Sequence, residues 1–398
     1  MKVCMVGSLL PIKVFDELVE KSKAKPSNAP ENFQMMFAKG FAQNKQDLTV
    51  ISFPTIAAYP KGPCFYFNKK NYTLDVGTDI RCPGFFNLPG LKQIGFFVKT
   101  YFHLKKWFKE SPDESKRVIV YSDYLFYATA ARWACKKEKN AECVLLMTDL
   151  PTFAFVPHKK SLASALVCKM DDIREKNYQK FDSYILLTKH MAEKMGVEEK
   201  PGIVVEGFSD PESYEFKQEK ADKKILMYCG ALSDVYNITA LLEAFQLCEI
   251  DAELWLFGSG TRENEVKQAA EKDSRIKFFG KVSREELLHC QKKAHLLVSI
   301  KSSDDEFTKY AFPSKILEYM TAGTAVLSTK IGGIPDEYYE YIYTIENEDV
   351  NAISAKIEEI LNLPMSELEE KGKKGQVFAV EKKNCQKQTK DIIDFLKG

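Results

Sequence analysis

The sequence lacks the features that mark several protein classes. Its 398 residues carry 57 Lys and Arg against 56 Asp and Glu, so a formal charge of +1 gives no overall attraction to nucleic acid or another polyanion. No apolar run reaches the roughly 20 residues that a membrane-spanning helix needs. The apolar run at residues 1–6 is also too short for the core of a secretory signal. These absences predict a protein that stays in the cytoplasm.

Metal-binding and dinucleotide-binding patterns are missing as well. The ten cysteines are scattered with no C-x-x-C pair, and several lie inside apolar runs, which predicts reduced core residues. None of the five histidines is paired at i, i+4, so no metal site is expected. A single glycine, Gly7, follows the first strand pattern in place of G-x-G-x-x-G, which argues against a nicotinamide-linked dehydrogenase.

The length predicts two domains, and both halves open with a buried strand that ends at glycine: KVCMVGS at 2–8 and KILMYCG at 224–230. From 224 onward, short apolar runs alternate with helical patterns, which indicates a doubly wound parallel sheet, and the first half repeats this less regularly. Strands are predicted at 47–53, 117–122, 143–148, 183–187, 253–258, 276–280, 295–300 and 325–329, and helices at 31–43, 90–110, 124–139, 161–180, 238–248, 262–271, 284–294 and 314–322.

The predicted fold class is therefore α/β, with two Rossmann-like doubly wound domains facing each other across a cleft at the carboxyl ends of their strands. We place the N-terminal domain at 1–208 and the C-terminal domain at 209–379, with the charged, proline-containing stretch 210–224 as linker. The last helix, about 380–398, is expected to pack back on the first domain. The glycines expected at strand ends are Gly7, Gly230, Gly258, Gly260, Gly280, Gly332 and Gly333.

Residues 310–323, YAFPSKILEYMTAG, combine a helix start, a cation and a carboxylate. A proline near the start and a glycine at the end predict a short helix over 314–322. The N-terminus of such a helix is a seat for phosphate, to which Ser314 adds a hydroxyl donor and Lys315 a charge. One turn further on, Glu318 can accept hydrogen bonds from a vicinal diol such as a ribose. The simpler interpretation is an ordinary capped helix with a solvated glutamate.

Four segments of the second half resemble the glycosyltransferase family four group of GT-B enzymes, in the family's order and spacing. They are YCGAL at 228–232 before LLEAF at 241–245, LFGSG at 256–260, FGKV at 279–282 before EEL at 285–287, and FPSK at 312–315 before LEY at 317–319. The resemblance implies a nucleotide-sugar donor held mainly by the second domain. The donor-binding residues that it implies are Lys281 and Val282 for the base, Glu318 for the ribose, Ser314, Lys315 and the Gly230 loop for the diphosphate, and also Gly7, Gly258 and Tyr310.

In the first half the match depends on Gly7-Ser8, on the helical pattern over 33–40 and on TDLP at 148–151. The family commonly has a histidine near this last segment. Here Asp149 occupies that point, and His158 follows a few residues on. We interpret Asp149 as a catalytic cleft residue that touches the acceptor or the donor sugar, with a turn residue before proline as the alternative.

Two departures from the family bear on donor recognition. Many members carry a second glutamate eight positions before the ribose glutamate, where this chain has Tyr310. The carboxylates left for that role are Asp304, Asp305 and Glu306. Many members also carry a basic residue after the first glycine of the second domain and a Lys-Gly further on, where this chain has Ala231 and Asn237-Ile238. Lys315 is therefore the main counter-charge expected for the diphosphate, and we assign it a catalytic role.

The implied reaction moves a sugar from a nucleoside diphosphate to an acceptor. The leaving phosphate gains negative charge, so catalysis needs fixed positive charge, which the helix start and Lys315 supply. The resemblance further implies retention of configuration, a UDP-sugar as donor, no metal or other cofactor, and a glycan or lipid-linked acceptor in surface polysaccharide biosynthesis. Two alternatives stay open: a nucleotide-sugar epimerase of the same architecture, in which water attacks, and a non-catalytic nucleotide-sugar-binding protein, which Tyr310 keeps in view.

Residues 91–109, LKQIGFFVKTYFHLKKWFK, mix aromatic side chains with lysines. A helix of this kind can lie in the membrane interface and bring the enzyme to a bilayer that carries a lipid-linked acceptor. The alternative is a helix that packs its aromatic face on the first sheet and leaves its lysines in solvent. We favour this alternative, because binding to anionic lipid usually needs a denser basic cluster.

Overall fold

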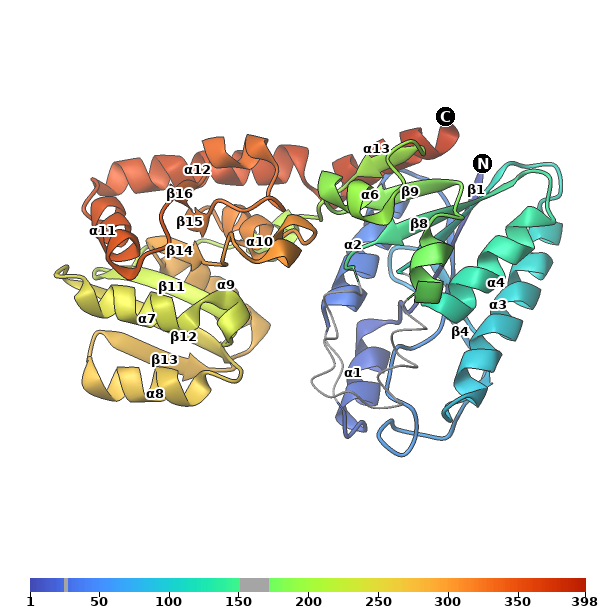
Figure 1. Cartoon of the computed structure of the whole chain (residues 1–398), viewed down its shortest axis with the longest axis horizontal. Coiled ribbons are helices and arrows are strands. Elements are labelled where there is room, and N and C mark those ends of the chain that lie inside the picture. Colours follow the sequence, from blue (N-terminus) through green and yellow to red (C-terminus); the bar gives the residue numbers. More distant parts are fainter. Residues whose placement is uncertain (25–27, 123, 151–171) are drawn as a thin grey trace. The chain divides into compact units, whose positions relative to one another are not determined.

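The structure is a computed structural model that describes residues 1–24, 28–122, 124–150 and 172–398. The chain divides into two compact units, which are described separately (Figure 1). Unit 1 contains residues 1–206 and 385–398, and unit 2 contains residues 207–384. The boundaries predicted from the sequence, after residue 208 and at about 380, lie close to these positions.

Unit 1 is an α/β layer structure around one large sheet. The described strands of this sheet are β1 (Lys2–Gly7), β2 (Leu48–Ser52), β4 (Lys70–Thr73), β5 (Asp79–Cys82), β7 (Lys116–Tyr121), β8 (Ala141–Met147), β9 (Ser183–Leu186) and β10 (Gly202–Val204). Their order is β10-β9-β8-β7-β1-β2-β5-β4, and within this described sheet β4 alone is antiparallel to its neighbour. Strand β1 lies between β2 and β7 with residues 3–6 buried, which explains its continuous apolar run.

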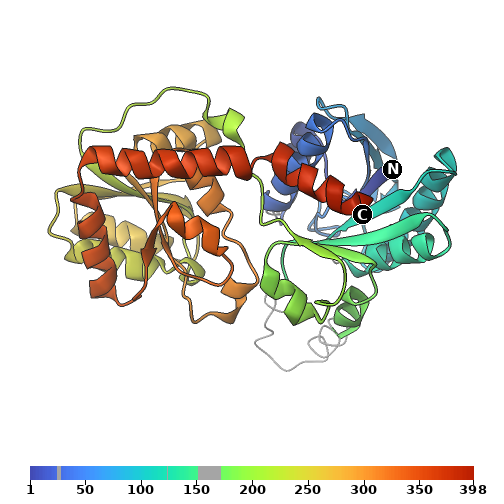
Figure 2. The ribbon, with the colours of Figure 1, turned by 90° about the horizontal axis from the view of Figure 1, so that it is seen from above.

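The helices of unit 1 include one from the far end of the chain. They are α1 (Ile12–Glu20), α2 (Ala29–Gln43), α3 (Leu91–Glu110), α4 (Leu125–Lys136), α6 (Lys189–Met195) and α13 (Cys385–Lys397). A short antiparallel pair of strands, β3 (Tyr66–Phe67) and β6 (Phe85–Phe86), lies beside α3. Helix α13 lies along α2 (Figure 2), where Gly40 gives it room: a Cβ there would lie 2.3 Å from the Cys385 carbonyl oxygen. Asn44 Nδ2 donates to the Gln386 carbonyl at 2.7 Å. The predicted helix over 161–180 lies mostly outside the described residues.

Unit 2 is a doubly wound sheet in which all described strand pairs are parallel. Its strands are β11 (Lys224–Ala231), β12 (Ala252–Ser259), β13 (Ile276–Gly280), β14 (Leu296–Ser299), β15 (Ala325–Thr329) and β16 (Tyr343–Ile345), in the order β13-β12-β11-β14-β15-β16. Its helices are α7 (Ile238–Leu247), α8 (Glu263–Lys272), α9 (Arg284–Lys293), α10 (Lys315–Thr321), α11 (Val350–Leu361) and α12 (Met365–Lys382). The order places the first strand in the middle, so the chain reverses its direction of winding between β11 and β14.

Alternate residues of β11 build two separate cores on the two faces of the sheet. Leu226 and Tyr228 pack with α7, α8 and α11, whereas Ile225, Met227 and Cys229 pack with α9, α10 and α12 (Figure 1). Successive side chains of a strand point to opposite faces of the sheet, and here both faces are buried. It explains why the sequence of β11 is apolar throughout.

The stretch 210–224, predicted as a linker, belongs to unit 2. It contains the short 3-10 helix η2 (Pro211–Tyr214), and Tyr214 is buried in the unit 2 core. Lys292 Nζ donates to the Tyr214 carbonyl at 2.9 Å and also to the Phe216 carbonyl. The linker prediction was wrong, because it was based on the charged residues of the stretch and overlooked Tyr214 and Phe216, which pack on unit 2.

Candidate functional site

The candidate site of unit 2 lies where β11 and β14 end side by side. In an open α/β sheet, ligands bind outside the carboxyl ends of the strands at the point where the winding reverses. Three segments meet there: the end of β11 at Gly230, Lys301 two residues after β14, and the first residue of α10, Lys315. The site therefore combines two predicted residues with one that the sequence interpretation missed.

Lys315 lies directly against the backbone of Gly230. A Cβ on Gly230 would lie 1.9 Å from Lys315 Nζ, and the φ of Gly230 is +146°. The ammonium donates to Tyr228 Oη at 2.8 Å and lies 4.2 Å from the ring centroids of Tyr228 and Tyr236. Glycine at 230 is thus required for the lysine to reach this position.

Lys301 is a second cation at the same place. It follows β14, is 6% exposed, and its Nζ lies 5.4 Å from the Tyr236 ring centroid and 5.6 Å from that of Phe307. The two ammonium groups therefore share Tyr236. Burial lowers the pKa of Lys315 from 10.5 to about 8; Cys229 and Glu318 oppose this shift, and the charge of Lys301 adds to it. Two buried ammonium groups near one ring can hold an anion, because a buried charge needs a partner of opposite charge.

Glu318 lies one turn along α10 and is held by a buried side chain of α9. Gln291 Nε2 donates to Glu318 Oε1 at 2.6 Å and to Cys229 Sγ at 3.3 Å. Tyr214 Oη donates to Gln291 Oε1 at 2.5 Å, which fixes the orientation of the amide. A carboxylate has further acceptor positions besides the one that Gln291 uses. The partly exposed Glu318 is thus pre-oriented to accept hydrogen bonds from a diol.

Tyr310 contacts one of the three carboxylates predicted to compensate for it. Its hydroxyl donates to Glu306 Oε1 at 3.1 Å, across the short 3-10 helix η4 (Glu306–Lys309). Phe307 of the same turn carries the ring that Lys301 approaches. Glu306 and Tyr310 therefore belong to the surroundings of the two lysines, and Glu306 is the carboxylate that Tyr310 contacts.

The other predicted residues of unit 2 lie around this centre. A Cβ on Gly258 would lie 1.8 Å from the Gly230 carbonyl oxygen, so Gly258 lets the ends of β11 and β12 approach each other. Ser314 is exposed and is the N-cap of α10 without a capping hydrogen bond from its side chain; the proline lies before the cap, outside the helix. Lys281 is exposed after β13, and Val282 packs on the core that contains α9 and α10.

Gly7 and Asp149 lie in unit 1, at the carboxyl ends of β1 and β8. Asp149 is exposed and close enough to Tyr121 to raise the pKa of that hydroxyl, together with burial and Glu31. His158, the alternative to Asp149, and Pro151 lie outside the described residues. The part of the chain that the structure describes contains no group of three His, Cys, Asp or Glu side chains that could hold a metal ion.

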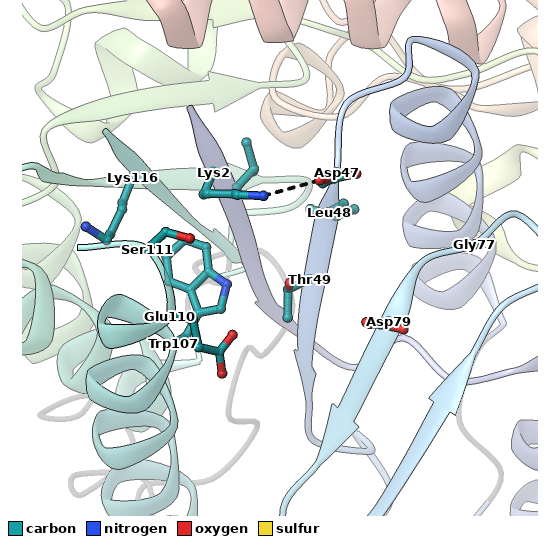
Figure 3. Close-up of a pocket in the computed structure, with 11 residues that line it drawn as sticks. Lys2, Asp47, Leu48, Thr49, Gly77, Asp79, Trp107, Glu110, Ser111 and Lys116 are labelled. Carbon is teal, nitrogen blue, oxygen red and sulfur yellow. Dashed lines mark hydrogen bonds and ion pairs between the residues drawn. The ribbon is translucent and has the colours of Figure 1, made fainter. Parts of the chain in front are cut away.

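A cavity of about 320 Å³ lies at the opposite edge of the unit 1 sheet (Figure 3). It is lined by the first residues of β1, β2, β5 and β7 and by the end of α3. Lys2 and Asp47 form an ion pair of 3.3 Å at its mouth. This is the amino edge of the strands, where open α/β sheets do not place their ligands, so we do not assign it to the site.

Helix α3 buries three of its six Phe, Tyr and Trp residues in the core. Phe96, Trp107 and Phe108 are buried, and the Phe96 ring centroid lies 4.5 Å from that of Phe53. A second apolar stripe of α3 is exposed to solvent: Leu91 by 51%, Ile94 by 58%, Val98 by 39% and Phe102 by 64%. The helix thus packs with part of its aromatic residues inward, as the simpler interpretation predicts, but Lys92 is buried as well and an apolar face remains exposed. Among the described helices, none has the length and apolar character to cross a bilayer.

Comparisons with known proteins agree with this architecture. Residues 210–376, most of unit 2, match the family model of Glycosyl transferases group 1. No curated protein sequence matches the chain.

Solved structures resemble the chain over its full length. An alpha,alpha-trehalose-phosphate synthase (UDP-forming) from Burkholderia xenovorans in complex with glucose-6-phosphate is similar at a TM-score of 0.68, with 10% identity and 100% of both chains covered. Sucrose-phosphate synthase from Thermosynechococcus elongatus is similar at a TM-score of 0.68, with 12% identity over 100% of this chain and 98% of that one. Anabaena Alr3699/HepE in complex with UDP and glucose is similar at a TM-score of 0.63, with 12% identity over 100% of both chains.

These likenesses establish the fold. The chain has the GT-B fold of glycosyltransferases, with two Rossmann-like α/β units, and the predicted fold class is confirmed. Membership of family four in particular stays a prediction, as do the roles of the individual site residues.

Proposed function

We propose that this protein is a retaining glycosyltransferase that moves a sugar from a nucleoside-diphosphate sugar, a UDP-sugar, to a hydroxyl of a glycan or lipid-linked acceptor. The observation that carries the proposal is the Lys315 ammonium held against Gly230 beside Lys301, at the carboxyl edge of the unit 2 sheet. The match of residues 210–376 to the group 1 glycosyltransferase model supports it. The UDP in the similar Alr3699/HepE structure supports the choice of nucleotide.

The two lysines supply the chemistry that the reaction needs. When the bond between sugar and diphosphate breaks, the electron pair stays on the β-phosphate oxygen, and an ammonium placed beforehand stabilises that charge without reorganisation. Burial lowers the pKa of Lys315, so its ammonium lacks solvent and is stabilised when an anion binds beside it. We assign catalysis to Lys315, with Asp149 facing the acceptor, and expect neither a metal nor another cofactor.

Donor recognition is assigned to the residues around the lysines. Glu318 accepts from the ribose, the backbone at 281–282 contacts the base, and the exposed hydroxyl of Ser314 donates to a phosphate. The sugar lies toward Glu306, which Tyr310 holds by its hydroxyl, in place of the second glutamate of the family. Surface polysaccharide biosynthesis in the cytoplasm is the setting that we propose.

We also propose that unit 1 contacts the inner face of an anionic membrane through α3. The exposed stripe of Leu91, Ile94, Val98 and Phe102 supplies apolar area, and the exposed Lys99 and its neighbours supply positive charge. Such contact would bring the enzyme to a lipid-linked acceptor. It requires no spanning helix.

A single set of measurements tests the proposal. The protein is incubated with UDP- and GDP-sugars, and free nucleotide is measured with and without acceptor, beside the melting temperature in each ligand. Acceptor-dependent release of UDP supports the transferase. Release with epimerised sugar and no acceptor supports the epimerase, and binding without release supports the non-catalytic protein. If no nucleotide sugar raises the melting temperature, the proposal is wrong.

A further inference from the structure

Unit 1 has its own point at which the winding reverses. From β1 the sheet continues to β2 and β5 on one side, and the chain then crosses to β7 on the other side. The carboxyl ends of β1 and β7 therefore lie side by side, at Gly7 and Tyr121. This is the position at which an open α/β sheet binds its ligands.

A closed polar network lies at this position. The Ser8 hydroxyl donates to Glu31 Oε1 at 3.0 Å and accepts from Gln34 Nε2 at 2.8 Å, and the Ser8 amide donates to Gln34 Oε1 at 2.9 Å. A Cβ on Gly7 would lie 2.2 Å from Gln34 Oε1, so the glycine is needed for this contact. Ser8 and Gln34 thus have their hydrogen bonds within the network and orient one oxygen of Glu31.

The other oxygen of Glu31 is left over. Glu31 is 3% exposed, and among the described residues its Oε2 is buried without a hydrogen-bond partner. Leaving a buried polar atom unpaired costs on the order of 1–3 kcal/mol, so such an atom calls for an explanation. Burial also raises the pKa of Glu31 to about 7, against the hydrogen bonds from the Ser8 hydroxyl and from the backbone amide of Glu31 itself. The fold uses only one of the two oxygens, since Oε1 accepts from the buried Ser8 hydroxyl.

The neighbours of Glu31 have the composition of a carbohydrate subsite. Tyr121 ends β7 beside Gly7, where a Cβ on the glycine would lie 3.2 Å from the Tyr121 Cβ. The Phe33 ring centroid lies 5.8 Å from that of Tyr121. Carboxyl and hydroxyl groups beside an aromatic pair suit a ligand with many hydroxyl groups and an apolar ring face.

We propose that Glu31, together with Asp149 at the carboxyl end of the neighbouring β8, binds the hydroxyl groups of a neutral sugar acceptor, one of which donates to Glu31 Oε2. This inference rests on the proposed glycosyltransferase function and specifies the chemical class of its acceptor. Two carboxyl groups on one ligand disfavour an anionic sugar phosphate, which like-charge repulsion would weaken. The acceptor is therefore a neutral sugar or the neutral end of a glycan.

The test compares Glu31→Gln with wild type in the full chain. Glutamine keeps the shape and the contact with Ser8, but turns one acceptor into a donor. The probes are methyl α-D-glucopyranoside and glucose 6-phosphate. Their binding is measured by saturation-transfer NMR, and each is also tested as an acceptor with UDP-glucose as donor. Wild type is expected to bind the neutral glycoside at least tenfold more tightly than the phosphate. In Glu31→Gln the KM for the glycoside rises about tenfold, with kcat and the dissociation constant of UDP unchanged within twofold.

Glu20→Gln, on the exposed part of α1, is the matched control and is expected to behave as wild type. A structural role of Glu31, or a buried water on Oε2, would shift the melting temperature without changing the KM for the glycoside, and would overturn the inference. Preference for glucose 6-phosphate, or no binding of the glycoside to wild type, would also overturn it. Failure of wild type to bind UDP is a separate result, which refutes the proposed function itself.

Discussion

Replacing Lys315 by methionine should make the free protein more stable and the nucleotide complex weaker. The fall of its pKa from 10.5 to about 8 corresponds to roughly 3 kcal/mol by which the native state disfavours the charged form. Since the side chain is partly exposed, solvent screening reduces this to about 1–2 kcal/mol. Methionine has a similar length, carries no charge and packs well between the rings of Tyr228 and Tyr236.

The sign of this effect follows from proton binding. The pKa of Lys315 is lower in the native state than in the unfolded chain, so the cost is fully present below pH 8. It disappears between pH 8 and about 10.5, where the native state has lost the proton and the unfolded chain still holds it. The melting temperature of Lys315→Met should therefore exceed that of wild type at pH 7, and the difference should shrink above pH 8.

Binding of UDP changes in the opposite direction. A charge-assisted hydrogen bond from the ammonium to a phosphate contributes about 1.5–3 kcal/mol, so the variant should bind UDP roughly 10- to 100-fold more weakly at pH 7. In wild type the affinity should fall above pH 8, by at most about tenfold per pH unit, as the free lysine loses its proton. This fall should be absent from the variant.

Calorimetric titration of UDP at pH 6.5 to 9.5 and thermal unfolding without ligand measure both effects. Lys272→Met, at the exposed end of α8, is the control and should change neither. A variant that is less stable than wild type at pH 7 and binds UDP with unchanged affinity would refute the account of Lys315 as a desolvated diphosphate ligand.

Three further predictions follow from the site and from α3. Gln291→Leu removes the donor that orients Glu318, so it should weaken UDP about tenfold while hardly affecting 2′,3′-dideoxy-UDP; equal losses for both ligands would argue against ribose binding by Glu318. Gly230→Ala should displace Lys315 and lower kcat at least 100-fold, while the circular dichroism spectrum stays that of the folded protein. Activity near that of wild type would contradict the close contact between Gly230 and Lys315. Phe102→Asp should abolish co-sedimentation with vesicles that contain one-third anionic lipid, whereas Val377→Asp, also exposed but in unit 2, should not; equal effects would remove α3 from the membrane contact.

In unit 2 the structure brings Lys315 against Gly230, two residues that the sequence had singled out, while their roles stay predictions. Gly230 at a strand end, and Lys315 with Glu318 on one helix, are positions that local patterns define. Lys301 was missed, although a lysine directly after an apolar strand run is a visible signal. Gln291 was not visible, because its amide reaches Glu318 only through the packing of α9 against α10, which no spacing in the sequence encodes.

Unit 1 was less predictable, for a physical reason. Residues 54–90 form very short strands, such as β3 and β6, whose runs are too brief to show a period. Glu31 looks like an ordinary acidic residue in the first turn of a helix, and its burial follows from the docking of α2 beside Gly7. Asp149 could be placed at a strand end from the sequence, but its neighbour Tyr121 comes from another strand.

The return of α13 to unit 1 has a practical consequence for cutting the protein into parts. A fragment that stops at residue 206 would leave one side of α2 bare, including the groove at Gly40 and the amide of Asn44. Such a fragment should aggregate unless residues 385–398 are joined to it through a flexible linker. Residues 207–384, by contrast, contain both of their cores in one continuous stretch and are the piece to express alone.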